Sequence, residues 1–184
     1  MASELTVQTL RGPTSGANAN KVLIPSGQTL DASNGFIAPA GHVVQHQFFN
    51  APYGGASNES ETSSSSFVAT LYQVAITPKF SNSRMLVFGN ISSKENGINY
   101  HQLALYRSIG GSSFSNVFTD AAIARNSNRT SLAYPQQGFH VPDQPNTTQE
   151  VIYKIYHRTS GGGHVSRLGD NSVTEFLHVM EIKL

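Results

Sequence analysis

Apolar and polar residues alternate along most of the chain from residue 41 onward, which is the period of a β-strand with one buried face. This pattern predicts six strands, separated by segments rich in Gly, Pro, Asn and Ser. Their ranges are 42–50, 67–77, 84–92, 98–107, 150–158 and 173–182. Shorter candidate strands lie at 121–124, 130–134 and 164–168. No long stretch has helical periodicity, so we expect an all-β domain.

Two of these segments indicate how the strands pack. In 67–77 the alternation places one set of apolar side chains on one side, namely Val68, Tyr72, Val74 and Ile76. Residues Met85 to Phe88 are apolar on both faces, which is expected of a strand in a sandwich interior or at a subunit interface. Together with the turns, the strands predict a β-sandwich of the jelly-roll kind over residues 41–184.

Residues 1–40 have a different pattern, in which short apolar pieces alternate with Gly, Pro, Asn and Ser turns. Each piece is too short to bury a core alone, so the segment is either a flexible tail or one strand of an oligomeric stalk. The spacing of the apolar positions favours the stalk. The residues that we expect to build this trimeric, virion-anchoring stalk are Leu5, Val7, Leu10, Val22, Ile24 and Leu30.

The same segment resembles a known family. The run LTVQTLRGPTSGANANKVLIPSGQTLDASNG (5–35) closely resembles the N-terminal segments of tail-fibre and other virion fibre proteins of marine and cyanobacterial tailed phages. Those proteins repeat elements such as TLRAPTSG and IPSGQTLDxSNG. The resemblance implies an extended, intertwined trimeric β-structure that leads from an anchoring end to a globular knob.

The C-terminal part resembles the knob domains of the same family. The matching runs are ITPKFSNSRMLVFG (76–89), NTTQEVIYKIYHRTSGGGHVSRLGD (146–170) and FLHVMEI (176–182). Knobs of this family adopt a homotrimeric fold similar to tumour-necrosis-factor jelly rolls. The two resemblances together leave residues 51–66 and 110–146 without a counterpart.

Composition excludes several further classes of protein and of functional site. The formal net charge is +1, so we expect no binding to nucleic acid or to an anionic membrane surface. The longest apolar runs are only a few residues, so we expect no membrane insertion. There is no Cys, which excludes disulfides, thiolate metal sites and cysteine nucleophiles. The apolar content of 38% is low for a monomer of this size and hints that another copy completes part of the core.

Seven histidines raise the question of a metal or catalytic site. His42 and His46 lie four residues apart in a predicted strand, about 13 Å along its axis, so one ion cannot bridge them within a chain. One His from each of three chains could still meet on a three-fold axis, although a satisfied or interface histidine is the simpler interpretation. For His101, His157 and His178 we expect solvent-facing or inter-subunit positions.

No catalytic motif is apparent in the sequence. It lacks the nucleophile-elbow motif G-x-S-x-G, and its 11 acidic residues lie mostly singly in loops and at strand ends. We therefore expect a protein that is not an enzyme and that has no cofactor and no metal site.

Residues 108–146 are the most promising place for recognition. This stretch combines aromatic rings with amide, imidazole and charged groups, which is what binding a many-hydroxyl glycan requires, and loops on a rigid sandwich commonly carry recognition. Alternatively, Tyr134 and Phe139 anchor the loop to the core or fill the trimer interface. The candidate receptor-binding residues are Arg125, Asn126, Asn128, Arg129, Tyr134, Gln136, Phe139, His140 and Asp143.

The sequence thus predicts a virion fibre protein with two parts, the stalk at 1–40 and the knob at 41–184. We expect a homotrimeric tail fibre whose N-terminus contacts other virion proteins, a tail adaptor or nozzle or the capsid, and whose knob binds a host surface polysaccharide. Two alternatives stay open. One is a head fibre or capsid-decoration protein, and the other is an adaptor that joins the tail to longer fibres.

Overall fold

The computed structural model describes residues 11–28, 39–51, 59–95, 100–119, 121–126, 135–161, 165–169 and 174–184. The chain divides into two compact units, Met1–Ile37 and Ala38–Leu184. All strands of the described residues belong to the second unit, and no helix occurs among them. Accordingly, the described residues include no helix that is long and apolar enough to cross a membrane.

In the first unit, residues 11–28 form a succession of turns without a strand. One backbone hydrogen bond runs from the N–H of Asn20 to the carbonyl of Pro13 at 2.7 Å. Val22 and Ile24, two of the predicted stalk residues, are 49% and 46% exposed. The other four predicted stalk residues lie outside the described residues, and they are Leu5, Val7, Leu10 and Leu30.

The second unit is built from strands of very different length. The long strands are β1 (Val43–Ala51), β3 (Val68–Ile76), β4 (Arg84–Glu95), β5 (His101–Ile109), β8 (Gln136–Asp143), β9 (Val151–Thr159) and β11 (Glu175–Ile182). The short strands are β2 (Ser60–Thr62), β6 (Ser115–Asn116), β7 (Ala124–Asn126) and β10 (Ser166–Leu168).

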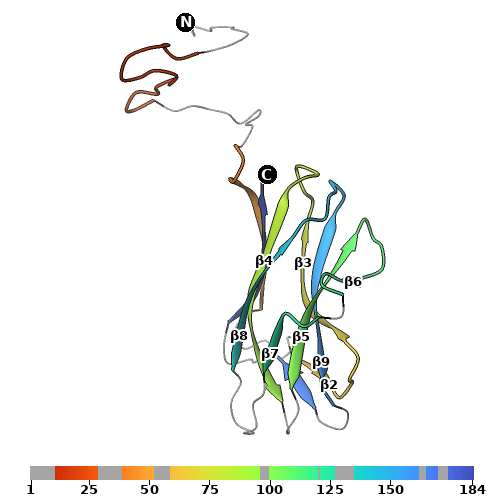
Figure 1. Cartoon of the computed structure of the whole chain (residues 1–184). Helices are drawn as coiled ribbons and strands as arrows, with labels where there is room; N and C mark the ends of the chain where they lie inside the picture. Colours follow the sequence, from red (N-terminus) through yellow and green to blue (C-terminus); the bar gives the residue numbers. More distant parts are fainter. Residues whose placement is uncertain are drawn as a thin grey trace, which may run out of the picture. The chain divides into compact units, whose positions relative to one another are not determined.

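These strands form two antiparallel sheets that face each other (Figure 1). The first sheet has the order β1-β11-β4-β10-β2, and β8 pairs with the other edge of β4. The second sheet has the order β3-β9-β5-β6, and β7 also pairs with β5. The predicted all-β class is therefore confirmed, with the two layers of a β-sandwich.

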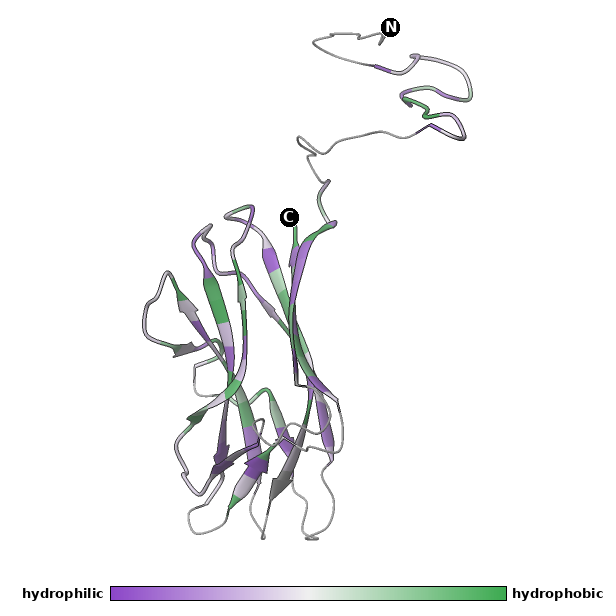
Figure 2. Cartoon of the chain, turned by 180° about the vertical axis from the view of Figure 1, so that it is seen from behind, coloured by the Kyte–Doolittle hydropathy of each residue, from purple (hydrophilic) through white to green (hydrophobic). Residues whose placement is uncertain are grey.

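Alternation along the strands creates the core between the sheets. Inward residues of both sheets are buried and their neighbours face outward, so buried and more exposed positions alternate along the long strands. Figure 2 shows hydrophobic and hydrophilic residues interspersed along the strands. The buried apolar cluster consists of Tyr72, Val74, Ile76, Met85, Val87, Ile91, Leu103, Leu105, Phe139, Val141, Val151, Tyr153, Ile155, Leu168, Leu177 and Val179. Val68, which the pattern placed on the same side as Tyr72, is instead 38% exposed.

All six strands predicted from alternation are present, with ends that differ by up to three residues. Of the shorter candidates, 121–124 overlaps β7 and 164–168 contains β10, whereas 130–134 lies outside the described residues. The strand β8 was not predicted, because we expected 108–146 to be a loop. Gly138 and Pro142 suggest a turn, but Pro142 is tolerated because β8, within the described residues, pairs with β4 alone and so is an edge strand.

Two histidines lie inside the sandwich. His101 and His157 are fully buried, with His101 Nε2 3.1 Å from His157 Nδ1. Burial lowers the pKa of His101 to about 3 and that of His157 to about 4, so both rings are neutral at physiological pH. The prediction of solvent-facing or inter-subunit positions is wrong for both, since His101 shares the phase of Leu103 and Leu105, whose side chains point inward.

One buried carboxylate ties the C-terminal strand to the rest of the domain. Glu181 of β11 accepts hydrogen bonds from Gln45 Nε2 and Ser83 Oγ, both at 2.6 Å, and from the backbone N–H groups of Lys79 and Phe80. Burial by itself raises the pKa of Glu181, but these hydrogen bonds outweigh burial and the pKa lies below its ordinary value. The charged side chain therefore joins β1 and the 79–83 turn to β11.

Candidate ligand-binding site

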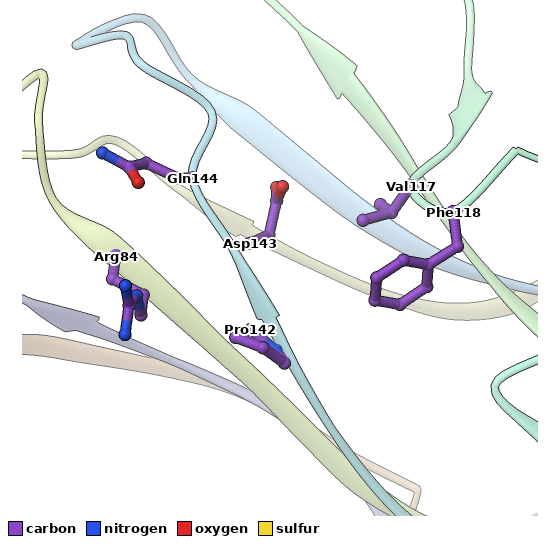
Figure 3. Close-up of a pocket in the computed structure, with 6 residues that line it drawn as sticks. All are labelled: Arg84, Val117, Phe118, Pro142, Asp143 and Gln144. Atoms are coloured by element: carbon purple, nitrogen blue, oxygen red, sulfur yellow. The ribbon is translucent and has the colours of Figure 1, made fainter.

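A surface hollow of about 410 Å³ lies beside the start of β4 and the end of β8. Its other wall is the segment that follows β6, so the two walls come from different sheets of the sandwich. In Figure 3, Arg84 and Phe118 lie on opposite sides of the hollow, with Pro142 and Asp143 between them. The lining residues are Arg84, Val117, Phe118, Pro142, Asp143 and Gln144.

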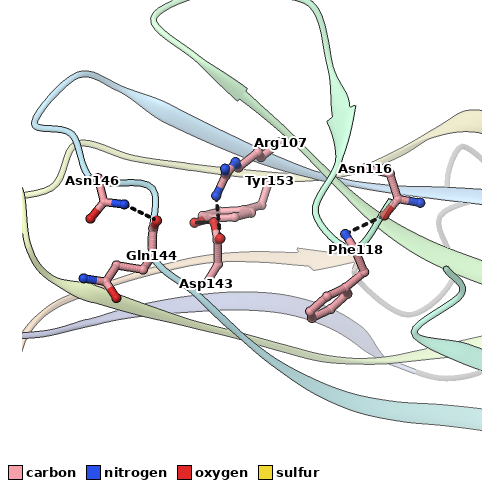
Figure 4. A network of polar contacts seen from close by, with 7 residues as sticks. All are labelled: Arg107, Asn116, Phe118, Asp143, Gln144, Asn146 and Tyr153. Atoms are coloured by element: carbon pink, nitrogen blue, oxygen red, sulfur yellow. Dashed lines mark hydrogen bonds and ion pairs between the residues drawn. The ribbon is translucent and has the colours of Figure 1, made fainter. Parts of the chain in front are cut away.

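The aromatic wall of the hollow is the ring of Phe118, which is 44% exposed. The turn that carries it is held by Asn116, whose Oδ1 accepts from the Phe118 backbone N–H at 2.9 Å (Figure 4). The Asn116 Nδ2 in turn donates to the carbonyl of Ala121 at 3.3 Å. An apolar ring is thus kept at the surface by a polar side chain at its base.

The acidic group of the hollow, the carboxylate of Asp143, is held in place by two hydrogen bonds. Asp143 Oδ1 accepts from Arg107 Nη1, and Asp143 Oδ2 accepts from the Tyr153 hydroxyl at 2.7 Å (Figure 4). Burial, followed by the charge of Asp143 and the hydrogen bond to it, raises the pKa of Tyr153, so this phenol stays protonated as a donor. The network orients the carboxylate, and the Asp143 side chain is 8% exposed, so it contributes a mostly buried acidic group beside the hollow.

The other polar groups of the hollow are less constrained. Arg84 is exposed and offers guanidinium donors. Gln144 is exposed as well. Its side-chain Nε2 lies 3.4 Å from the backbone carbonyl of Asn82, and its backbone carbonyl accepts from Asn146 Nδ2 at 3.2 Å. A ring, a guanidinium, an amide and an oriented carboxylate around one hollow suit a ligand that combines an apolar face with several hydroxyls.

The predicted receptor-binding residues do not gather in one loop. Arg125 and Asn126 lie on β7 of the second sheet, where the Arg125 guanidinium covers the ring of Tyr100 at 4.3 Å. Asn126 Nδ2 donates to the carbonyl of Ser93 at 3.2 Å. Asn128, Arg129 and Tyr134 lie outside the described residues.

The remaining four predicted residues lie on β8 of the first sheet. Gln136 is exposed and accepts from Asn90 Nδ2 at 2.7 Å, and His140 is exposed on the outer face. Phe139 is buried in the core, so its ring cannot stack on a sugar, in line with the alternative that it anchors this segment. Only Asp143 lines the hollow.

Arg84 and Phe118, which the sequence analysis did not single out, complete the hollow. Arg84 opens a predicted strand and lies far in sequence from Phe118, so no motif links the two. The sequence around Phe118 could have identified it as a candidate, because it is a large aromatic residue in a polar stretch without strand alternation. Such a residue either anchors its loop or is presented at the surface.

One Ser–His contact lies elsewhere, where Ser60 Oγ is 3.1 Å from His157 Nε2. The distance suits a nucleophile and its general base, but the imidazole is fully buried and its pKa of about 4 makes it a weak base at neutral pH. Within the described ranges, no group of three or more His, Cys, Asp or Glu side chains is arranged to hold a metal ion.

Comparison with known proteins finds distant similarity to solved structures, at low sequence identity and low TM-score. No family model matches the chain, and no curated protein matches it. Among solved structures, the infectious bursal disease virus VP2 subviral particle is 12% identical with a TM-score of 0.41, over 94% of this chain and 45% of that one. The infectious bursal disease virus Gt strain structure is 11% identical with a TM-score of 0.40, over 88% and 41%.

A third solved structure, TmCBM61 in complex with beta-1,4-galactotriose, is 9% identical with a TM-score of 0.30. The match covers 75% of this chain and 90% of that one. By contrast, this chain spans less than half the length of the viral chains that it matches.

Proposed function

We propose that this chain is a structural virion fibre protein of a tailed phage, a homotrimeric tail fibre whose knob binds a host surface glycan during adsorption. In this proposal residues 1–40 form the trimeric stalk and attach the fibre to another virion protein. Residues 41–184 form the knob and act by binding, without catalysis. The knob adopts a jelly roll of the tumour-necrosis-factor type.

The observation that carries the glycan part is the exposed ring of Phe118 beside the oriented carboxylate of Asp143. A sugar ring presents an apolar face of C–H groups and a rim of hydroxyls. The Phe118 ring suits the former, and the exposed polar groups of Arg84 and Gln144 suit the latter, with Asp143 as a mostly buried acidic group beside them. Both Asp143 oxygens already accept hydrogen bonds, which favours a binding role over acid–base chemistry.

Strand connectivity supports the jelly-roll part of the proposal. The first and last long strands, β1 and β11, are neighbours, followed by β4 and β8, while β3, β9 and β5 lie in the facing sheet. Consecutive long strands therefore cross between sheets repeatedly, as in double-sheet jelly rolls. The exposed apolar residues Val22 and Ile24 support the stalk, because packing of three copies would cover them.

Three copies would convert weak single sites into firm attachment. Linked sites gain an effective concentration that raises apparent binding ~10²–10⁴-fold without any new contact. A modest affinity per hollow is then sufficient for adsorption, and it agrees with a hollow that is shallow and partly polar.

The proposal is tested by exposing the full-length protein to an array of bacterial surface polysaccharides. We expect a bound glycan, and at least ~10-fold weaker binding for Phe118→Ala, the loss expected from truncating an aromatic anchor. Leu71→Ala is the matched control, because Leu71 is 57% exposed on β3 and does not line the hollow.

Two results would contradict the glycan role. One is binding that Phe118→Ala leaves unchanged. The other is the absence of any bound polysaccharide together with antibody labelling of the protein on the phage head, which is the result expected of a head fibre or decoration protein.

A further inference from the structure

The outer face of the first sheet carries a continuous row of aromatic rings and imidazoles. Phe48 of β1 is paired in register with His178 of β11, His178 with Phe88 of β4, and Phe88 with His140 of β8. All four side chains point away from the core. We call this surface, formed by the outward residues of β1, β11, β4 and β8, the Phe-His face.

His178 is at the centre of the face. Its ring centroid lies 5.2 Å from that of Phe88, 4.9 Å from that of Phe176 and 5.7 Å from that of Phe48. The neighbouring row of outward residues across the four strands contains no acidic or basic group other than an imidazole. It consists of residues paired in register, His46, Met180, Leu86 and Pro142. Phe48 is 62% exposed, a high value for a phenylalanine.

Aromatic residues beside the second sheet differ from those of the Phe-His face. Three rings that directly precede strands of the second sheet are covered by cations of the same chain, while Tyr106 and Tyr156 on its strands stack on each other. The pairs are Arg125 over Tyr100 at 4.3 Å, Arg158 over Phe67 at 4.2 Å and Lys154 over Phe114 at 5.6 Å. Within the described part of the chain, no Lys or Arg covers Phe48, Phe88 or Phe176. A ring covered by a cation is compatible with exposure to solvent. The rings of the Phe-His face have no such cover and form an exposed apolar surface.

Charge and size indicate what covers this face. Among the described residues, the outward positions of β1, β11 and β8, and of β4 between Arg84 and Asn90, include no Asp, Glu or Lys, and one Arg, Arg84, stands at the rim of the face. A strongly charged partner therefore finds no complementary group. Four strands about 4.8 Å apart and 8 residues long span roughly 500 Å² in projection, before side-chain relief is added. That scale approaches the ~800 Å² that each partner buries in a stable interface.

We propose that copies of this chain pack together through the Phe-His face and that its histidine pair makes this contact sensitive to acid. The inference rests on the proposed homotrimer and names the surface that assembles it. An uncharged face requires an uncharged partner, and the same face on another copy meets that requirement. It also accounts for the low apolar content of the chain, because part of its core would lie between copies.

The acid sensitivity follows from the hydrogen bonds of His178. Its Nε2 lies 3.2 Å from Asn50 Oδ1 and its Nδ1 lies 3.0 Å from His46 Nε2. The tautomer that donates to Asn50 must accept from His46, and protonation of both imidazoles makes His46 Nε2 and His178 Nδ1 both donors, which breaks the second bond. The other titratable or charged groups of the face are His140 on β8 and Arg84 on β4, and neither can neutralise an imidazolium. Burial between copies therefore favours the uncharged pair.

The test measures the mass of the full-length protein by size exclusion with light scattering, at micromolar concentration and pH 8. We expect an oligomer for the wild type and at least ~30-fold weaker association for Phe48→Glu, as for loss of an interface anchor. The matched control is Leu71→Glu, which places the same charge on an equally exposed apolar residue of the other sheet. Thermal unfolding checks that both variants fold.

A second series lowers the pH from 8 to 5. We expect the apparent dissociation constant of the wild type to rise at least ~10-fold within this range, and to rise below the ordinary histidine pKa of about 6.5, because burial and the neighbouring His46 lower the pKa of His178. His178→Phe should remain oligomeric at pH 8 and dissociate at a lower pH than the wild type. An unchanged midpoint in this variant would overturn the role given to the histidine pair.

The outcomes separate this inference from the proposed function. If the wild type and Phe48→Glu are both oligomeric with equal affinity, the Phe-His face is not the interface and the trimer stands. If Leu71→Glu dissociates as readily as Phe48→Glu, the face has no special role. A monomeric wild type overturns both the interface and the proposed trimer, while polysaccharide binding remains a separate measurement.

Discussion

Phe139 lies across Gly89 on the neighbouring strand. The two residues are paired in register between β8 and β4, and a Cβ atom added to Gly89 would be 2.7 Å from the Phe139 ring and 2.8 Å from the carbonyl oxygen of Phe176. Because Gly89 has no side chain, the ring of Phe139 can occupy the space above it. This relationship fixes β8 on the sandwich, and with it the Asp143 end of the hollow.

Gly89→Ala should destabilise the domain because the added methyl group forces the Phe139 ring or β11 to move. The expected loss is about 1–3 kcal/mol in the free energy of unfolding, as for overpacked cores. Chemical denaturation measures it. Gly138→Ala is the control, since a Cβ on Gly138 meets nothing within 4 Å, and an equal loss in both variants would contradict the explanation.

Stability should fall on acidification because His101 and His157 are buried without charge. Their folded-state pKa values of about 3 and about 4 lie below the ordinary value of about 6.5, so the unfolded chain binds more protons at acid pH. Their contribution is complete above pH 6.5 and is lost as the pH falls through the folded-state values, about 4 for His157 and about 3 for His101. The slope for the two groups together approaches roughly 2.7 kcal/mol per pH unit.

Urea denaturation between pH 7.5 and 4.5 measures this slope, on the Phe48→Glu variant so that dissociation of copies does not contribute. His157→Gln should remove about half of the slope. His42→Gln, which changes an exposed histidine, should leave it unchanged. A flat profile without these substitutions would show that the buried rings do not control acid stability.

Glu181→Ala should destabilise the domain by about 3 kcal/mol, because buried donors lose their acceptor. The backbone N–H groups of Lys79 and Phe80 and the hydroxyl of Ser83 are affected directly. Since the folded-state pKa of Glu181 is lowered, its contribution is complete above the ordinary carboxyl pKa and is lost as the pH falls through the folded value. Exposed Glu150→Ala is the control, and similar unfolding midpoints for both would contradict this role.

The second unit should fold without residues 1–40. The buried apolar cluster lies entirely between Tyr72 and Val179, and the terminal backbone bonds from Gly41 N–H to the Lys183 carbonyl and from Lys183 N–H to the His42 carbonyl survive this truncation. We expect residues 41–184 to unfold within about 0.5 kcal/mol of the full chain, measured by denaturation on the Phe48→Glu background. A fragment without cooperative unfolding would show that the first unit is needed for folding.

Alternation was sufficient to predict the long strands whose inward and outward positions differ in polarity. β9 is the clearest case, since Val151, Tyr153 and Ile155 are buried and their neighbours are not. The same rule, applied in phase, would have placed His157 inside, because it continues that series. β8 could not be recognised in this way, as Gly138 and Pro142 on its outward side have the composition of a turn.

The hollow was predictable only in part. Asp143 was a candidate from the sequence, but its neighbours Arg84 and Phe118 come from distant segments that only the pairing of β4 with β8 and the packing of the sheets bring together. The buried ring of Phe139 shows the converse. Composition identifies residues that suit a glycan, whereas strand phase decides which of them face solvent.

The pairing of β1 with β11 has a mechanical consequence. Residue 43 begins a strand whose hydrogen bonds to β11 run perpendicular to its axis, from Val43 opposite Ile182 to Ala51 opposite Glu175. A force that pulls the start of β1 along the strand loads these bonds together in shear and does not open them one at a time. The domain is thereby suited to hold under tension applied at its N-terminal end.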